Sequence, residues 1–228
     1  MKVYEMEQYS EAYWAIKLGK LSASQMDKIV SPTGKNSSSL KDYVFKKIAE
    51  LETGEREETF ESYHMKRGLA LEPEAKRRFS FITGLEVVNV GVVVNAKYPY
   101  LCASPDGLDP NYNKFGLEIK CPMPGELLKT RYEKVIPTKN KAQVYSSLWL
   151  CDDVERWYFM SYHPEMEPFI TFIDRTDPDY ITYATALEAR LPVVKHLISD
   201  IKKNDPEYIA YITTPESGFL SLENSHGV

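Results

Sequence analysis

Hydrophobic positions along the chain follow two periods, one typical of strands and one typical of helices. Residues 87–96 (VVNVGVVVNA) form a nearly continuous β-branched run, which predicts a central strand. We expect a second strand to lead into residues 104–107 and to pair with the first, and a third to cover residues 116–120. Residues 155–162 and 169–173 alternate or run apolar in the same way, so they predict further strands.

Other segments carry their apolar residues at helical spacing. Helices are predicted over residues 1–19, 25–30, 40–51, 60–84, 123–135, 138–151 and 179–203. The segment 60–84 contains Gly68 and Pro73, which weaken or interrupt a helix, so we expect a break or bend near them.

This order of elements predicts an α/β or α+β fold in which a mixed central β-sheet is flanked by helices. A chain of 228 residues suits one well-packed domain over residues 1–228, burying about 70% of its surface, with residues 223–228 as a loose tail. No apolar run reaches the roughly 18 residues of a membrane helix, and the first residues lack the features of a signal peptide. We therefore expect no membrane partner and a cytoplasmic location.

The strongest candidate for chemistry is a set of charged residues in the middle of the chain. Glu118 and Lys120 are two residues apart on a predicted strand, so both side chains leave the same face. If this strand pairs with the preceding one as a hairpin, Asp106 comes close to both. The alternative is a solvent-exposed face with an ordinary ion pair. The apolar Leu-Cys-Ala-Ser before the Asp and the tight Pro-Asp-Gly turn favour a functional site.

Two neighbouring carboxylates repel each other unless a cation neutralises them. Carboxylate oxygens of this kind suit Mg²⁺, which keeps several waters and also binds substrate phosphate. A Lys beside the metal can orient or activate an attacking water and stabilise developing negative charge. The arrangement therefore predicts metal-dependent hydrolysis of a phosphodiester.

Composition limits the kinds of metal site that the chain can form, and its net charge bears on whether the substrate is a nucleic acid. The 3 Cys are widely separated, which argues for reduced thiols and against an iron–sulfur cluster, and the 4 His show no zinc-ligand spacing. The formal net charge of −5 is unfavourable for binding nucleic acid. Lys and Arg nevertheless cluster between residues 35 and 78, and an enzyme that encloses its substrate needs a basic lining only on the inside.

Residues 104–107 and 117–122 together resemble the Asp…Glu-x-Lys core of the restriction-endonuclease-like, or PD-(D/E)xK, nucleases. More narrowly, they are similar to the viral recombinase branch typified by lambda phage exonuclease. Residues 18–24, 68–72 and 142–144 match that branch in the same order, and the resemblance spans residues 14–173.

The resemblance implies roles for the catalytic residues. Asp106 and Glu118 would ligate metal, with the backbone carbonyl of Ile119 as a third ligand, and Lys120 would activate or orient water. Glu72, four residues after Gly68, would support a second metal or its water. The implied cofactor is Mg²⁺, two ions per site with DNA bound, with Mn²⁺ as a substitute.

It also implies residues that contact the substrate. Ser24 would bind a DNA phosphate, although an ordinary helix cap is the alternative. Gln143 would position substrate or water. Lys17 stands where the family has Arg and keeps the charge but not the bidentate fork. Met65 would be a wedge at the duplex end, with core packing the favoured alternative.

The activity implied by the resemblance is 5′→3′ exonuclease digestion of duplex DNA. One strand is removed from ends that are preferably 5′-phosphorylated, and a 3′ overhang remains for recombination in a phage or prophage. A homotrimeric ring and a single-strand annealing protein as partner are implied as well. The alternatives are a structure- or sequence-selective endonuclease on the same core and a DNA-end-binding protein without catalysis.

Overall fold

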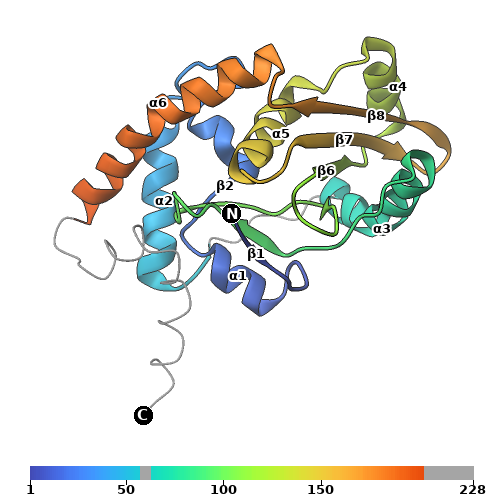
Figure 1. The fold of residues 1–228 in the computed structure, drawn as a ribbon. Helices are drawn as coiled ribbons and strands as arrows, with labels where there is room; N and C mark the ends of the chain where they lie inside the picture. Colours follow the sequence, from blue (N-terminus) through green and yellow to red (C-terminus); the bar gives the residue numbers. More distant parts are fainter. Residues whose placement is uncertain (57–62, 203–228) are drawn as a thin grey trace.

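The computed structural model describes residues 1–56 and 63–202 (Figure 1). The first half contains β1 (Lys2–Tyr4), α1 (Glu11–Lys17), β2 (Leu21–Ser22), the 3-10 helix η1 (Ala23–Lys28), α2 (Leu40–Thr53), α3 (Tyr63–Thr83), β3 (Val92–Val94) and β4 (Leu101–Ala103). The second half contains β5 (Gly107–Leu108), β6 (Phe115–Lys120), α4 (Pro124–Glu133), α5 (Thr138–Leu150), β7 (Arg156–His163), β8 (Met166–Asp174) and α6 (Pro178–Ile201).

The strands form two mixed sheets of four strands, in the orders β1-β3-β4-β2 and β5-β6-β7-β8. Parallel pairs join β2 to β4 and β6 to β7, and the other pairs are antiparallel. The mixed α/β class is as predicted, but the expected central sheet is divided in two. The division occurs because β4 ends at Ala103 and β5 begins at Gly107, so residues 104–106 carry the chain from one sheet to the other.

Helices cover the two sheets on different sides. In Figure 1, α3 and α4 lie beside β6, β7 and β8, whereas α2 and α6 lie together on the opposite side of the molecule, and α5 packs between α6 and the strands. Leu117 and Ile119 of β6 pack against Ala75 and Phe79 of α3 in a small buried cluster. This face of β6 is therefore sealed by α3, as the alternation along the strand predicts.

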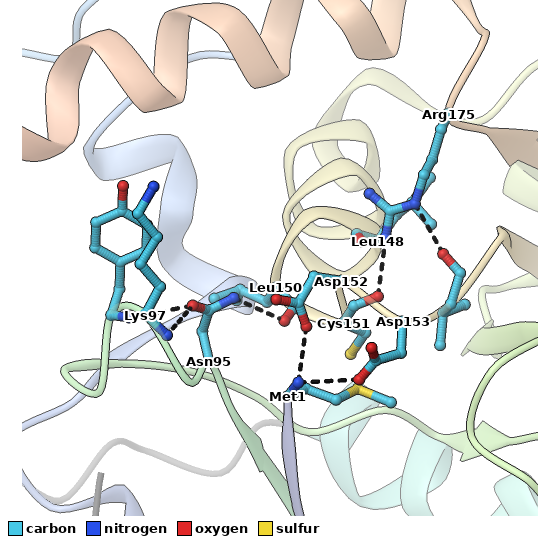
Figure 2. Close-up of polar contacts among 11 residues, drawn as sticks. Met1, Asn95, Lys97, Leu148, Leu150, Cys151, Asp152, Asp153 and Arg175 are labelled. Carbon is cyan, nitrogen blue, oxygen red and sulfur yellow. Dashed lines mark hydrogen bonds and ion pairs between the residues drawn. The ribbon is translucent and has the colours of Figure 1, made fainter. Parts of the chain in front are cut away.

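Arg175, just after β8, ties the end of α5 to the second sheet. Its guanidinium donates hydrogen bonds to the carbonyl oxygens of Leu148 and Cys151 at 2.9 and 3.0 Å, as Figure 2 shows. Its Nε also donates to Val154, at 2.9 Å. The last carbonyls of a helix have no partner within the helix, so Arg175 satisfies groups that would otherwise be buried alone.

Most predicted elements are confirmed to within a few residues, but four are wrong in part. The strand predicted over residues 87–96 is reduced to β3 (Val92–Val94). Residues 1–19 are not one helix: β1 pairs with β3 before the short α1 begins, and this long-range pairing overrides local helical spacing. Residues 25–30 form no regular helix, since η1 begins at Ala23 and is distorted at Gln25. α3 is not broken at Gly68 or Pro73 but continues through both.

The predictions for residues 60–62, 203 and 223–228 concern residues outside those that the structure describes. No helix within the described ranges combines the length and the apolar character needed to cross a membrane. Cys102, Cys121 and Cys151 are all free, as expected from their separation.

Candidate active site

Asp106 lies at the junction of the two sheets and is held against β6 from two directions. Its backbone N–H donates to the carbonyl of Leu117 at 3.1 Å, and its Oδ2 accepts a hydrogen bond from the N–H of Ile119 at 2.5 Å. The hairpin differs from the predicted one, because β6 pairs with β5, which follows Asp106, and not with β4. The predicted convergence of Asp106 with the strand carrying Glu118 and Lys120 is nevertheless present.

Glu118 is buried, so it does not belong to the solvent-exposed ion-pair face that was the alternative interpretation. Only 1% of the residue is exposed, and its Oε1 accepts a hydrogen bond from Nζ of Lys120 at 2.5 Å. Its second oxygen, Oε2, is buried and has no hydrogen-bond partner. A buried carboxylate oxygen without a partner is costly, so it marks a place where a ligand would be stabilising.

Burial and mutual electrostatic interaction shift the pKa values of Asp106, Glu118 and Lys120. Burial, then Glu118 and Glu72, raise the pKa of Asp106 well above its ordinary value. Burial also raises the pKa of Glu118, more than Lys120 lowers it. Burial alone would lower the pKa of Lys120, but Glu118 and Asp106 raise it above its usual range. The Lys therefore stays cationic, and the two acids are poorly compensated as anions.

Glu72 lies on α3, and its negative charge acts on Asp106 and Glu118. Its carboxylate forms an ion pair with Lys76, one turn further along the helix, at 2.8 Å, and its side chain is 19% exposed. Glu72 is thus half-buried and not freely solvated, as a Glu on a helix usually is. Because it raises the pKa of both Asp106 and Glu118, it adds to the negative field at the site.

A divalent cation fits this chemistry. Two acids that burial and mutual repulsion disfavour as anions, together with the unpaired Oε2 of Glu118, form a site that a cation would stabilise. Across residues 1–56 and 63–202, no three His, Cys, Asp or Glu side chains are grouped closely enough to hold a metal by themselves. The donor set is therefore of the kind that Mg²⁺ accepts, with one or two carboxylates and the other positions left to water and substrate.

Arg67, a residue that the sequence pattern did not single out, fixes the end of β6, the strand that carries Glu118 and Lys120. Its Nη1 on α3 donates to the carbonyls of Cys121 at 2.6 Å and Pro122 at 3.2 Å, directly after Lys120. Charge-assisted hydrogen bonds of this length are strong. Arg67 thus limits the movement of the segment that positions Lys120.

A second polar cluster lies on the other side of Asp106. Nζ of Lys17 donates to the hydroxyl of Tyr13 at 2.8 Å and to Oγ of Ser104 at 3.1 Å. Ser104 is two residues before Asp106, and the sequence pattern did not single it out as a candidate site residue. The parallel pairing of Ser22 with Cys102 brings Ser24, two residues further along, to the same end of the sheet. Lys17 and Ser104 are therefore in contact, and Ser24, whose Oγ lies 2.7 Å from that of Ser22, follows the strand that is paired with the one before Ser104.

A sequence profile of the YqaJ-like viral recombinase domain matches residues 12–154, well over half of the chain. The chain belongs to the YqaJ-like viral recombinase family. Each residue predicted to act in catalysis or substrate binding, from Lys17 to Gln143, lies inside the matched region.

Solved structures agree with this membership of the YqaJ-like family. The chain is similar to LHK-Exo, an alkaline exonuclease from Laribacter hongkongensis, with 27% identity and a TM-score of 0.70 over 85% of this chain and 97% of that one. LHK-Exo in complex with dAMP gives a TM-score of 0.69 at the same identity and coverage. A phage-related exonuclease from Haemophilus somnus 129PT, at 16% identity, TM-score 0.51, and coverage of 80% of this chain and 96% of that one, shows a likeness of fold alone. No curated protein matches the sequence.

The remaining predicted site residues of this YqaJ-like chain are placed as follows. Met65 on α3 is 55% exposed, so the core-packing role that was favoured for it is wrong. Gln143 is half-buried on α5, a helix that contacts β6, and its role stays a prediction. Asp109, close to this site in sequence, accepts hydrogen bonds from the backbone N–H groups of four residues after it, so it stabilises the turn that follows β5.

Proposed function

We propose that this protein is a metal-dependent exonuclease that digests one strand of duplex DNA from its 5′ end. Mononucleotides are released, and the remaining 3′ overhang serves recombination by strand annealing. The observation that carries the proposal is the convergence of Asp106, Glu118 and Lys120, with one buried oxygen of Glu118 left unpaired. The similarity to LHK-Exo supports it, because that alkaline exonuclease was solved with dAMP, a deoxynucleoside monophosphate.

In this proposal Asp106 and Glu118 hold Mg²⁺, with the carbonyl of Ile119 as a third protein ligand and a second ion present when DNA is bound. Mn²⁺ substitutes for Mg²⁺. The metal supplies activation of water and neutralisation of phosphate charge. Glu72 adds negative charge beside the two ligands, which strengthens the attraction for divalent ions.

Lys120 acts as a cation and not as a base, because its neighbours keep it protonated. Its ammonium donates hydrogen bonds that orient the attacking water and stabilise charge developing on the phosphate. Gln143 positions the water or the substrate from α5. The side chain of Lys120 is 35% exposed, so it is accessible to a substrate entering from solvent.

The contact of Lys17 with Ser104 is the proposed seat of the 5′ phosphate, with Ser24 proposed as a further ligand. One ammonium and two hydroxyls suit an anion, and Ser104 lies two residues from the metal ligand Asp106. A single nucleotide could then extend from this seat to the catalytic acids. Exposed Met65 is the proposed wedge against the last base pair.

Assembly into a homotrimeric ring around DNA, and cooperation with a single-strand annealing protein, belong to the same proposal. A ring explains how a chain with a net charge of −5 can act on DNA, since only the inner surface has to be basic.

The test is digestion of linear duplex DNA carrying either a 5′ phosphate or a 5′ hydroxyl, with Mg²⁺ or with chelator, beside an Asp106→Ala variant. We expect metal-dependent release of mononucleotides, faster from phosphorylated ends and absent in the variant. Covalently closed circular duplex is included because an endonuclease would cut it and an exonuclease would not. Equal digestion by Asp106→Ala would show that the catalytic site lies elsewhere.

A further inference from the structure

Tyr9 has an unusual backbone conformation at the edge of the candidate active site. It precedes Ser10, the N-cap of α1, and lies outside the region that matches the family. Its φ is +70°, in the left-handed region where a residue with a side chain is disfavoured and Gly is preferred. Such a conformation persists only where neighbouring contacts enforce it, and these positions concentrate at functional sites.

The neighbours of Tyr9 fix it next to the catalytic residues. Nε2 of Gln8 donates to the carbonyl of Pro105, the residue before Asp106, at 2.8 Å, and to that of Val90 at 3.0 Å. On the other side, Oγ of Ser10 accepts a hydrogen bond from the N–H of Tyr13 at 3.3 Å. The loop that carries Tyr9 is therefore attached to the segment that positions the metal ligand.

The ring of Tyr9 extends an aromatic cluster toward solvent. Its centroid lies 5.6 Å from that of Tyr13 and 5.9 Å from that of Trp14. The hydroxyl of Tyr13 in turn donates to Oγ of Ser104 at 3.2 Å, within the proposed phosphate seat. Tyr9 itself remains 51% exposed. It therefore presents an open aromatic surface beside Tyr13, which contacts Ser104, and next to Gln8, which contacts the residue before Asp106.

The charge state of Tyr9 suits this position. Burial of the hydroxyl, followed by the nearby Tyr13, Glu72 and Asp106, raises its pKa to about 12. The phenol is therefore neutral throughout the range in which enzymes act, and it adds no negative charge to the site.

We propose that Tyr9 is a substrate-contacting residue whose ring stacks on the base of the terminal nucleotide of the digested strand. This inference rests on the proposed function, since it takes the terminal nucleotide to lie between the Lys17–Ser104 cluster and Asp106. Aromatic side chains bind bases in this way because every base offers a π face. Purines, which have the larger face, gain more from the contact than pyrimidines.

The variants Tyr9→Phe, Tyr9→Ala and Tyr9→Gly separate the ring from the backbone. Phe keeps the ring and is expected to retain kcat/KM within about threefold. Ala and Gly both remove it and are expected to lower kcat/KM by about 5- to 100-fold, chiefly through KM and more for purine-ended than pyrimidine-ended strands. Gly adopts a positive φ without strain and Ala does not, so Tyr9→Gly is expected to melt about 2–4 °C above Tyr9→Ala.

This comparison distinguishes a contact with substrate from a structural role, because a structural role would make the activity follow the melting temperature. Tyr132→Ala is the matched control, since that Tyr is 87% exposed on α4 and lies outside the proposed site. It is expected to leave activity unchanged.

Digestion is measured beside fluorescence anisotropy of labelled 5′-phosphorylated duplex in chelator, so that binding is observed without cleavage. Weaker binding and slower digestion by both Ala and Gly variants support the inference. Wild-type binding and digestion by Tyr9→Gly would overturn it and leave the exonuclease proposal standing. A wild type that binds ends without digesting them would overturn the exonuclease proposal, with the role of Tyr9 then decided by binding alone. A wild type that neither binds nor digests would overturn both.

Discussion

Nζ of Lys120 lies 2.5 Å from Oε1 of Glu118, two residues before it on the same strand, and the other oxygen of Glu118 has no hydrogen-bond partner. Lys120 therefore pairs with only one of the two carboxylate oxygens of Glu118. The Lys compensates only part of the buried charge, and Asp106 brings a second carboxylate to the same place. A strand that served stability alone would gain from an apolar residue at this position, because a buried ion pair seldom repays its desolvation.

Replacing Glu118 by Gln keeps the shape of the side chain and removes its charge. We expect the variant to fold, to lose the rise in melting temperature that Mg²⁺ gives the wild type, and to digest DNA at least about 100-fold more slowly. Thermal unfolding with and without Mg²⁺ and a nuclease assay measure the two effects. Glu133→Gln on the exposed face of α4 is the control. A Glu118→Gln protein that Mg²⁺ still stabilises as it does the wild type would exclude Glu118 as a metal ligand.

Arg67 and Arg175 allow a matched comparison, since each donates to backbone carbonyls that close a secondary-structure element. Loss of charged hydrogen bonds to partly buried carbonyls costs about 1–3 kcal/mol, so Arg67→Ala and Arg175→Ala are both expected to unfold at lower urea concentration. Only the carbonyls bound by Arg67 directly follow Lys120. We therefore expect kcat to fall about tenfold or more in Arg67→Ala, and to stay near the wild-type value in Arg175→Ala at a temperature where both are folded. Equal activities in the two variants would mean that Arg67 has only a structural role.

Much of β6 and of the turn that carries Asp106 could be predicted from sequence, because their signals are local. The two-residue spacing of Glu118 and Lys120 fixes their common face, and the Pro-Asp-Gly turn places Asp106 at a chain reversal. The helix predicted over residues 138–151 is likewise present, as Thr138–Leu150, although its second half is buried on all sides.

The features that were missed depend on contacts between distant parts of the chain. The pairing of Val3 with Val93 makes a strand of a segment whose own spacing resembles a helix. Tyr13 and Ser104 meet across 91 residues, and Arg67 and Cys121 across 54. A local pattern identifies which face of an element is apolar, but it does not determine which element packs there.

Substitution of Lys17 tests the proposed phosphate seat. Its ammonium lies 3.1 Å from Oγ of Ser104, and a 5′ phosphate at this place would be bound by both groups. Lys17→Ala is expected to slow digestion of 5′-phosphorylated duplex by about tenfold and to leave 5′-hydroxyl duplex almost unchanged, so the ratio of the two rates approaches one. Lys17→Arg keeps the charge and is expected to keep the preference. An unchanged ratio in Lys17→Ala would place the phosphate seat elsewhere.

Burial of Lys20 is expected to make the stability of the folded protein depend on pH in the alkaline range, independently of catalysis. The residue is 5% exposed, and burial lowers its pKa from 10.5 to about 8, against a smaller opposing effect of Cys102. A folded-state pKa below the unfolded value means that the full stability is present above about pH 10.5 and is lost as the pH falls through about 8. The change is on the order of 3 kcal/mol for one buried amine.

We expect urea unfolding of the wild type to show this rise in stability between pH 8 and 10, and Lys20→Met to lack it. Lys129→Met, at a side chain that is 72% exposed, is expected to follow the wild-type slope. Parallel pH curves for wild type and Lys20→Met would show that the amine of Lys20 keeps its ordinary pKa in the folded protein.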